Sequence, residues 1–218
     1  MAELRTEEEQ VEAIKKWWKE NGTTLILTVV IVFSGWFGWS FWQDQKQQAQ
    51  ENASQLYNQL VQTAVQPAVT EAGLNNMKAL ATELKTEYAG TSYAEFGTLF
   101  LARFAAEEGN YDEAVAELTN LVENSKHEPV KYTAQARLAQ VYIQQEKLDE
   151  ALALVSTSPS AAYTSQFEEA KGDALYLKGE FAEAQQAYKT ALEAAQKIGL
   201  RANSLQRKLD MLASSGDI

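Results

Sequence analysis

The side chains that could do chemistry in this sequence are few and scattered. The only histidine, His127, stands in the segment NSKHEPV beside a proline, where a turn is expected, and no serine has a recognisable nucleophile context. The chain has no cysteine, which excludes thiol chemistry, a disulfide framework and a lipoprotein anchor. These residues therefore predict no nucleophilic or thiol catalysis.

The carboxylates occur in adjacent pairs, which a helix turns away from each other. Such pairs are Glu107-Glu108, Asp149-Glu150 and Glu168-Glu169. General acid and base catalysis needs two groups that face one substrate, whereas neighbours in a helix do not face each other. Acidic residues at the expected starts of helices, such as Asp112 and Asp149, suit the helix dipole instead. Since the sequence shows neither a glycine-rich phosphate loop nor metal-ligand spacing, we expect no enzyme, no metal and no cofactor.

The composition favours an acidic, all-helical domain. The chain carries 30 acidic and 19 basic side chains, a formal net charge of −11, which disfavours nucleic acid as a partner because phosphates are bound by clustered Lys and Arg. With three prolines and eleven glycines among abundant Ala, Glu, Gln and Leu, the sequence is typical of an all-α fold.

One segment, LILTVVIVFSGWFGWSFW from Leu25 to Trp42, has 18 residues and no charge. At about 1.5 Å per residue, a helix of this length spans the hydrocarbon core of a bilayer. A core helix of a soluble protein would carry a polar stripe. A signal peptide has a shorter apolar region and a cleavage site of small residues, whereas this segment ends in bulky aromatic side chains. We therefore predict an uncleaved transmembrane helix over residues 23–42.

The flanks of this helix predict its direction. Basic residues are retained on the cytoplasmic side of a membrane, and four precede the helix whereas the stretch 43–60 holds one, Lys46. We expect residues 1–22 to form a cytoplasmic amphipathic tail, broken from the span at Asn21-Gly22, and residues 43–218 to lie on the opposite side. The four basic residues are Arg5, Lys15, Lys16 and Lys19.

Beyond a connecting helix over residues 43–68, the sequence repeats itself. The stretches GNYDEA (109–114), EKLDEA (146–151) and GEFAEA (179–184) align, and their closing alanines are 37 and 33 residues apart. The pattern resembles the tetratricopeptide repeat, a helix-turn-helix of about 34 residues with small residues where its helices cross. By that register the small residues are Ala114, Ala151 and Ala184 in the second helices and Ala102, Ala139 and Gly172 in the first.

The repeats define a domain over residues 69–218. A partial copy is expected over 69–105, with its first helix from Val69 to Tyr88, and the segment STSPS (156–160) shortens the second full copy. A capping helix over 198–212 would cover the last apolar face with its leucines and turn Arg201, Arg207 and Lys208 to solvent. The predicted fold is all-α, with one N-terminal transmembrane helix, a tetratricopeptide-like solenoid and a C-terminal capping helix.

The repeat resemblance implies that the first helices line a protein-binding groove. By its register the groove residues are Phe96, Leu99, Arg103, Gln140, Ile143, Asp173 and Tyr176. The alternative is that some of them pack into a neighbouring repeat or lie under the 43–66 helix. Arg103 alone does not form the cluster of Lys, Arg and Asn with which some chaperone-binding relatives hold a peptide carboxylate.

The span contains a second candidate interface. Ser34 and Gly38 are four residues apart and Gly35 widens the same notch, a pattern that lets a partner helix approach closely in lipid. The alternative is a plain anchor, because glycine is common in membrane helices.

The block EQVEAIKKWWKENG (9–22), followed directly by the span and degenerate repeats, resembles the YfgM family of ancillary SecYEG translocon subunits. The resemblance implies a Gram-negative inner-membrane protein with a periplasmic domain. It also implies association with SecYEG and with PpiD, a membrane-anchored periplasmic chaperone of the prolyl-isomerase type, and a role in helping newly translocated client chains. An envelope scaffold that organises division or envelope-assembly proteins without binding clients is the alternative.

The charge asymmetry around the span generates a topological prediction. A reporter that is active only outside the cytoplasm should be active when fused after Ile218 and inactive when fused before Met1, because the basic flank stays inside. Cell fractionation with N-terminal sequencing should recover a membrane-bound chain that begins near Met1. A shortened soluble product would identify the apolar segment as a signal peptide.

Overall fold

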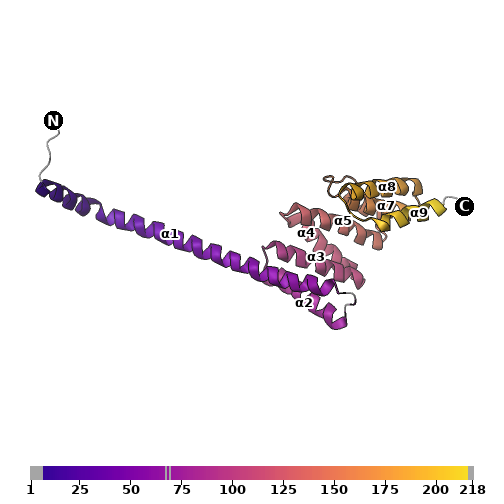
Figure 1. Cartoon of the computed structure of the whole chain (residues 1–218), viewed down its shortest axis with the longest axis horizontal. Coiled ribbons are helices and arrows are strands. Elements are labelled where there is room, and N and C mark those ends of the chain that lie inside the picture. Colours follow the sequence, from indigo (N-terminus) through magenta and orange to yellow (C-terminus); the bar gives the residue numbers. More distant parts are fainter. Residues whose placement is uncertain (1–6, 67, 69, 216–218) are drawn as a thin grey trace, which may run out of the picture. The chain divides into compact units, whose positions relative to one another are not determined.

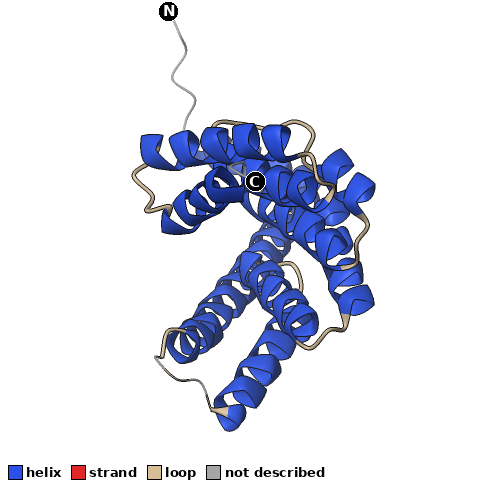
Figure 2. Ribbon diagram, turned by 90° about the vertical axis from the view of Figure 1, so that its right-hand side faces the viewer, coloured by secondary structure: helices blue, strands red, loops and turns tan. Residues whose placement is uncertain are grey.

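The computed structural model describes residues 7–66, 68 and 70–215, and this part of the chain is helical with no strand (Figure 2). Its contacts divide the chain into two compact units, Met1–Glu51 and Asn52–Ile218. The helices of the described residues are α1 (Glu7–Ala64), α2 (Glu71–Glu87), α3 (Ser92–Glu107), α4 (Tyr111–Asn124), α5 (Glu128–Gln144), α6 (Leu148–Leu154), α7 (Thr164–Leu177), α8 (Phe181–Lys197) and α9 (Asn203–Ser215). The predicted all-α fold is confirmed.

In the first unit, α1 runs without interruption through Asn21 and Gly22, so the predicted break there is wrong. Gly22 is buried beneath Trp18, whose indole Cε2 would lie 3.2 Å from a Cβ at this position. The Asn21 side chain donates a hydrogen bond to the Trp17 carbonyl at 3.1 Å. The Trp18 indole shields the backbone that a glycine would otherwise expose to water. The side-chain amide of Asn21 forms its hydrogen bond within the helix and does not cap a helix end. Arg5 of the predicted tail lies outside the described residues.

The apolar segment of α1 has the properties of a membrane span. Of the described helices, α1 alone is long and apolar enough to cross a bilayer, and the large side chains from Leu25 to Trp42 are exposed. The Thr28 hydroxyl donates to the Thr24 carbonyl at 2.8 Å, which satisfies this polar group inside the helix as an apolar medium requires. The predicted N-terminal membrane helix is thus present, and it continues as helix beyond the span.

In the second unit, consecutive helices from α2 to α9 pack against each other along the chain (Figure 1). The part of α1 after Asn52 joins them, because Ala53 and Leu60 are completely buried in a cluster with Leu84 of α2. The α2 helix begins after Thr70, whose hydroxyl accepts a hydrogen bond from the Gly73 amide at 3.1 Å. Val69, the predicted start, lies outside the described residues.

The repeat register is confirmed at the turns. Helices α4, α6 and α8 begin at Tyr111, Leu148 and Phe181, the third residue of each repeated stretch. The residue two positions earlier has φ of 78° at Gly109, 59° at Glu146 and 79° at Gly179. In each turn the following amide donates to the carbonyl five residues before it: Asn110 to Ala105 at 2.8 Å, Lys147 to Tyr142 at 2.9 Å and Glu180 to Leu175 at 3.0 Å. Because Glu146 adopts a backbone conformation that favours glycine, the repeat geometry fixes this turn more strongly than the residue type does.

Small residues lie where the helices cross, as the register predicts. Ala114, Ala151 and Ala184 are completely buried, and Ala102 and Ala139 are buried as well. At Gly172 in α7, an added Cβ would lie 2.5 Å from Cε1 of Tyr188 in α8, so only glycine leaves room for this ring. Gly97 plays the same part between α3 and α2, where a Cβ would lie 2.8 Å from the Ala81 carbonyl oxygen.

The predicted C-terminal cap is present as α9, which starts at Asn203 and not at 198. Gly199, with φ of 73°, ends α8 and accounts for the later start. Leu205 and Leu212 are buried against α8 and α7, and Leu209 is partly buried beside them. The cap therefore covers the apolar face that the last repeat would expose to water.

The crossing of α7 and α8 generates a stability prediction. Ala184→Leu should lower the free energy of unfolding of residues 43–218 by about 1–3 kcal/mol, because a larger side chain cannot fit a completely buried helix crossing. Ala182→Leu, on the exposed side of the same helix, is the matched control and should leave stability nearly unchanged. Urea denaturation followed by circular dichroism measures both. Equal midpoints for the two variants would contradict the register.

Candidate protein-binding groove

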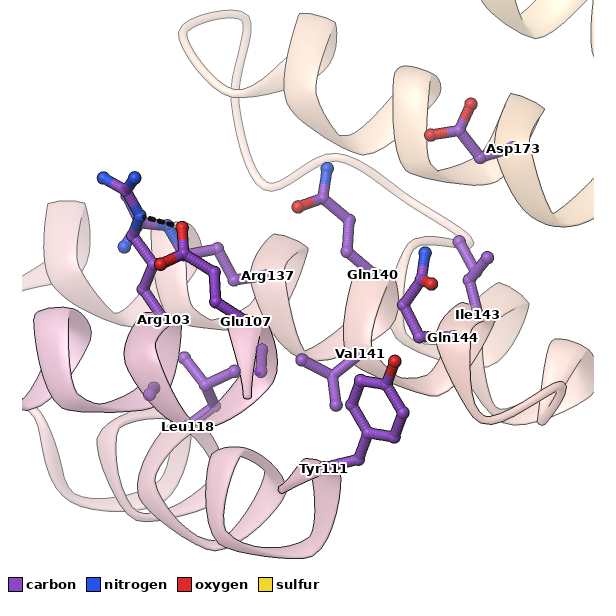
Figure 3. A pocket seen from close by; sticks show the side chains of 12 residues that line it. Arg103, Glu107, Tyr111, Leu118, Arg137, Gln140, Val141, Ile143, Gln144 and Asp173 are labelled. Atoms are coloured by element: carbon purple, nitrogen blue, oxygen red, sulfur yellow. Dashed lines mark hydrogen bonds and ion pairs between the residues drawn. The ribbon is translucent and has the colours of Figure 1, made fainter. Parts of the chain in front are cut away.

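An open groove of about 600 Å³ lies between the first helices of the repeats (Figure 3). Helices α3 and α5 supply most of its wall, α4 adds Tyr111 and Leu118, and α7 adds Asp173. Four of the seven residues expected from the repeat register line it: Arg103, Gln140, Ile143 and Asp173.

The other three expected residues do not line this groove. Phe96 lies against the end of α1, with its ring centroid 5.3 Å from that of Tyr57. Leu99 is 7% exposed and belongs to the core between α3, α4 and α5. Tyr176 packs its ring 5.5 Å from Phe181 at the start of α8. Phe96 thus packs against the end of α1 and Leu99 packs into the core; Ile143, 6% exposed, also belongs to a core cluster although it reaches the groove.

The floor and wall along α5 are polar. Arg137, Gln140 and Gln144 are spaced by three and four residues, so they share one face of the helix and follow the groove. Sequence reasoning missed Arg137 and Gln144, although this spacing on a predicted first helix was a signal that could have found them. Amide side chains both donate and accept hydrogen bonds, which suits contact with a peptide backbone.

One end of the groove is cationic. The Arg103 Nε atom donates to Glu107 Oε1 at 2.8 Å, one turn along α3. The Arg137 Nη1 atom lies 3.5 Å from the carbonyl oxygen of Leu99, which is one turn before Arg103. Burial, and next the positive charge of Arg103, lower the pKa of Arg137, but a guanidinium keeps its proton at neutral pH. Two guanidinium groups and one carboxylate, Glu107, line this end of the groove, so its side chains carry net positive charge.

The other end of the groove is anionic and is tied to the cap. Asp173 Oδ1 accepts hydrogen bonds from the Tyr188 hydroxyl at 2.8 Å and from Lys208 Nζ at 2.6 Å, and Lys208 also binds Glu169 at 2.8 Å. The prediction that Lys208 faces solvent is wrong, because the two carboxylates of α7 draw its ammonium inward. The Lys208 ammonium also lies 5.4 Å from the centre of the Tyr188 ring.

This network shifts the titration of its members. Burial, together with the neighbouring Asp173, raises the pKa of the Tyr188 hydroxyl well above its usual range. Burial by itself lowers the pKa of Lys208, but hydrogen bonds to Asp173 and Glu169 and the charges of both outweigh it, so the net pKa is raised. At neutral pH the folded protein thus holds a protonated lysine and a neutral tyrosine over the carboxylate.

His127 has the connectivity of a catalytic triad but not its setting. Its Nε2 atom lies 3.2 Å from Ser92 Oγ and its Nδ1 atom 2.9 Å from Glu95 Oε2. The His127 side chain is half exposed, whereas a catalytic histidine works in a water-excluded site. The nearby Ala94 amide already donates a hydrogen bond to the Thr91 hydroxyl, so this amide is not free to stabilise an oxyanion. We interpret these hydrogen bonds as structural contacts that hold the start of α3 against the turn before α5. Among the described residues, no three His, Asp or Glu side chains gather as metal ligands.

The chain is similar to known proteins over most of its length. The profile of a tetratricopeptide repeat-like domain matches residues 15–214. Proteins named "Ancillary SecYEG translocon subunit" are similar over most of their length: the Aggregatibacter actinomycetemcomitans protein is 31% identical over 94% of this chain and 100% of its own, and the Haemophilus influenzae protein 30% identical over 85% and 92%. The Neisseria gonorrhoeae protein of that name is 29% identical over 97% of this chain and 100% of its own.

The chain belongs to the family of ancillary SecYEG translocon subunits. Both resemblances drawn from the sequence, to the YfgM family and to the tetratricopeptide repeat, are confirmed. Since the matched region starts at residue 15, it includes part of the N-terminal block and the whole apolar segment as well as the repeats. No solved structure matches this chain.

The network at the anionic end generates a prediction for pH and mutation. A raised folded-state pKa stabilises the fold below the unfolded-state pKa, about 10 for Tyr and Lys, and the stabilisation disappears as the pH rises through the folded-state value. Stability should therefore be constant from pH 7 to about 9.5 and fall above it. Lys208→Met should cost about 1–3 kcal/mol at pH 7, because it leaves Glu169 and Asp173 without their cation, and should make the alkaline fall smaller without removing it, since Tyr188 still contributes.

Urea denaturation from pH 7 to 11 measures both effects. Lys197→Met, which removes an exposed lysine of α8, is the charge-matched control and should leave the profile unchanged. An alkaline fall of the same size in Lys208→Met and the parent protein would contradict the assignment.

Proposed function

We propose that this chain is a single-pass subunit of the SecYEG translocon whose repeat domain lies in the periplasm and binds segments of protein chains. The observation that carries the proposal is the similarity, over most of the chain, to proteins named as ancillary SecYEG translocon subunits, which extends through the span and the repeats. The basic flank before the span supports a cytoplasmic N-terminus.

The groove supports a binding role. It is open, about 600 Å³ in volume, and lined by amide, charged and aromatic side chains together with apolar ones such as Leu118 and Val141. A groove of this kind suits an extended chain better than a small ligand, because small-molecule sites enclose their ligands in a largely apolar cavity. We propose newly translocated client chains as its occupants, and by family resemblance the periplasmic chaperone PpiD as a second partner. We assign the chain no catalytic role.

The span supports a separate contact inside the membrane. No atom beyond the helix's own backbone would lie within 4 Å of a Cβ at Gly35 or Gly38, so with Ser34 they form a notch open to a neighbouring helix. In lipid, helices associate through close backbone packing, which small residues permit. We propose that a translocon or chaperone span packs there, since Trp36 and Trp39 beside the notch leave less room for a second copy of this chain.

Affinity purification in mild detergent tests both contacts. The full chain should recover SecY, SecE and SecG, and Gly38→Leu should reduce their recovery about fivefold, since helix packing in lipid contributes about 1 kcal/mol. Val29→Leu, on the opposite side of the helix, is the matched control. Quantitative mass spectrometry measures the recovery.

The outcomes separate the alternatives. Recovery of division or envelope-assembly proteins without translocon subunits would contradict the proposed function and favour the scaffold. Full translocon recovery by Gly38→Leu, with loss only when residues 43–218 are exchanged, would show that the span is only an anchor.

A further inference from the structure

Three lysines form a cluster on α1 just before the membrane span. Lys19 stands four residues after Lys15 and three after Lys16, so the three exposed side chains are neighbours on one side of the helix. The positions three and four residues after Lys19 hold Gly22 and Thr23, so no carboxylate is its neighbour at helical spacing. Like charges at this spacing repel each other, and an anion between them would remove the repulsion.

The unbroken helix fixes the depth of this cluster. Because α1 continues through Gly22 beneath the Trp18 indole, the lysines keep a set position relative to the apolar segment. Lys19 is six residues before Leu25, which places it about 9 Å farther out along the helix axis. The headgroup layer outside the hydrocarbon core is about 5–8 Å thick, so Lys19 lies near its outer surface. The other two lysines lie one turn farther out, within a Debye length of the headgroups.

Two aromatic side chains mark the same level. Trp17 and Trp18 are 51% and 53% exposed and stand within the lysine cluster. Indole rings favour the headgroup layer, because they join a large apolar body to a polar N–H group. The cluster is thus surrounded by lipid headgroups on the sides of the helix that no protein covers.

The other end of the span has no such cluster. Its nearest lysine, Lys46, lies 5.3 Å from the centre of the Trp42 ring and follows Asp44 by two residues. A lone lysine with a nearby carboxylate attracts anions weakly. The two ends of the span therefore differ in their attraction for negatively charged headgroups.

We propose that Lys15, Lys16 and Lys19 bind the phosphate of an anionic phospholipid in the leaflet next to them. Continuity with the span identifies the occupant, since lipid headgroups supply phosphate at this depth all round the helix. Each ammonium group carries three hydrogen-bond donors for phosphate oxygens, and the net negative charge of the lipid favours it over a zwitterionic one. The inference goes beyond the proposed function, because it requires only the span and neither the groove nor the translocon.

Nearby carboxylates confine the site to one side of the helix. Glu12 and Glu20 each stand four residues from Lys16 and compete for it. Glu20 follows Lys19 directly, but a helix turns the two side chains about 100° apart. Lys19 is also the member of the cluster closest to the membrane, so we expect it to make the strongest contact with the lipid.

Quenching of a bimane label by brominated lipids tests the proposal with the full chain in phosphatidylcholine vesicles. The chain has no cysteine, so Ile26→Cys provides a single label, seven residues beyond Lys19 on the same face. Brominated phosphatidylglycerol should be about fivefold enriched at this label over brominated phosphatidylcholine, and added salt should shrink the preference. A label at Phe41→Cys, at the other end of the span, should show a preference below about twofold.

An exchange of two neighbours separates a specific site from the general attraction of a basic segment. The double variant Lys19→Glu with Glu20→Lys keeps the composition, net charge and depth of the segment, but it moves the lysine to another face of the helix. This variant should lose the preference at the first label. Lys46→Gln, at the other end of the span, is the control and should retain it. If the exchanged chain does not insert, Lys19→Gln with Glu20→Gln replaces it at the same net charge.

Two results would overturn the lipid site. One is equal quenching by the two brominated lipids at the first label. The other is a preference that persists when Lys19 and Glu20 are exchanged, because net charge alone would then account for it. Neither result bears on the proposed function, which the recovery of translocon subunits tests separately.

Discussion

Close approach of helix backbones is the constraint on which the repeat domain depends. Gly172 admits the Tyr188 ring to a distance that any side chain would forbid, and Gly97 does the same for the α2 backbone. With alanines at the remaining crossings, the helices pack with little freedom to shift. Arg103 and Arg137 project from α3 and α5, whose separation is set by a shared core that includes the buried Ala102, Ala114 and Ala134.

The sequence was most informative where structure is set locally. The starts of α4, α6 and α8 and the buried alanines follow from short patterns that repeat in register, so the fold could be predicted well. The errors came from contacts between distant residues or from unexpected local ones. Lys208 has the period of a solvent-facing residue, yet carboxylates 35 and 39 residues away bind it. The helix continues past Gly22 because Trp18 folds over it, a contact that no propensity describes.

The candidate site was predictable only in part, and for the same reason. A repeat register tells which face of a helix is inward, but it does not tell which inward residues are covered by the next element. Phe96 is covered because the end of α1 brings Tyr57 against it, and the place of α1 could not be read from the repeats.

Acidic residues at helix starts also have more than one role. Asp112 accepts a hydrogen bond from Gln145 at 3.0 Å, and Asp149 accepts one from Lys178 at 2.8 Å, so aligned positions link successive repeats.

The two ends of the groove differ in how tightly they are coupled to the fold. Asp173 lines the groove, but its oxygens are taken by Tyr188 and Lys208, so any change there also loosens the contact between α7 and the cap. Arg137 has no such partner, and the exposed Arg103–Glu107 pair stabilises the fold little. The charges of the cationic end therefore contribute less to folding than those of the anionic end, so substitutions at Arg103 or Arg137 should leave the solenoid intact.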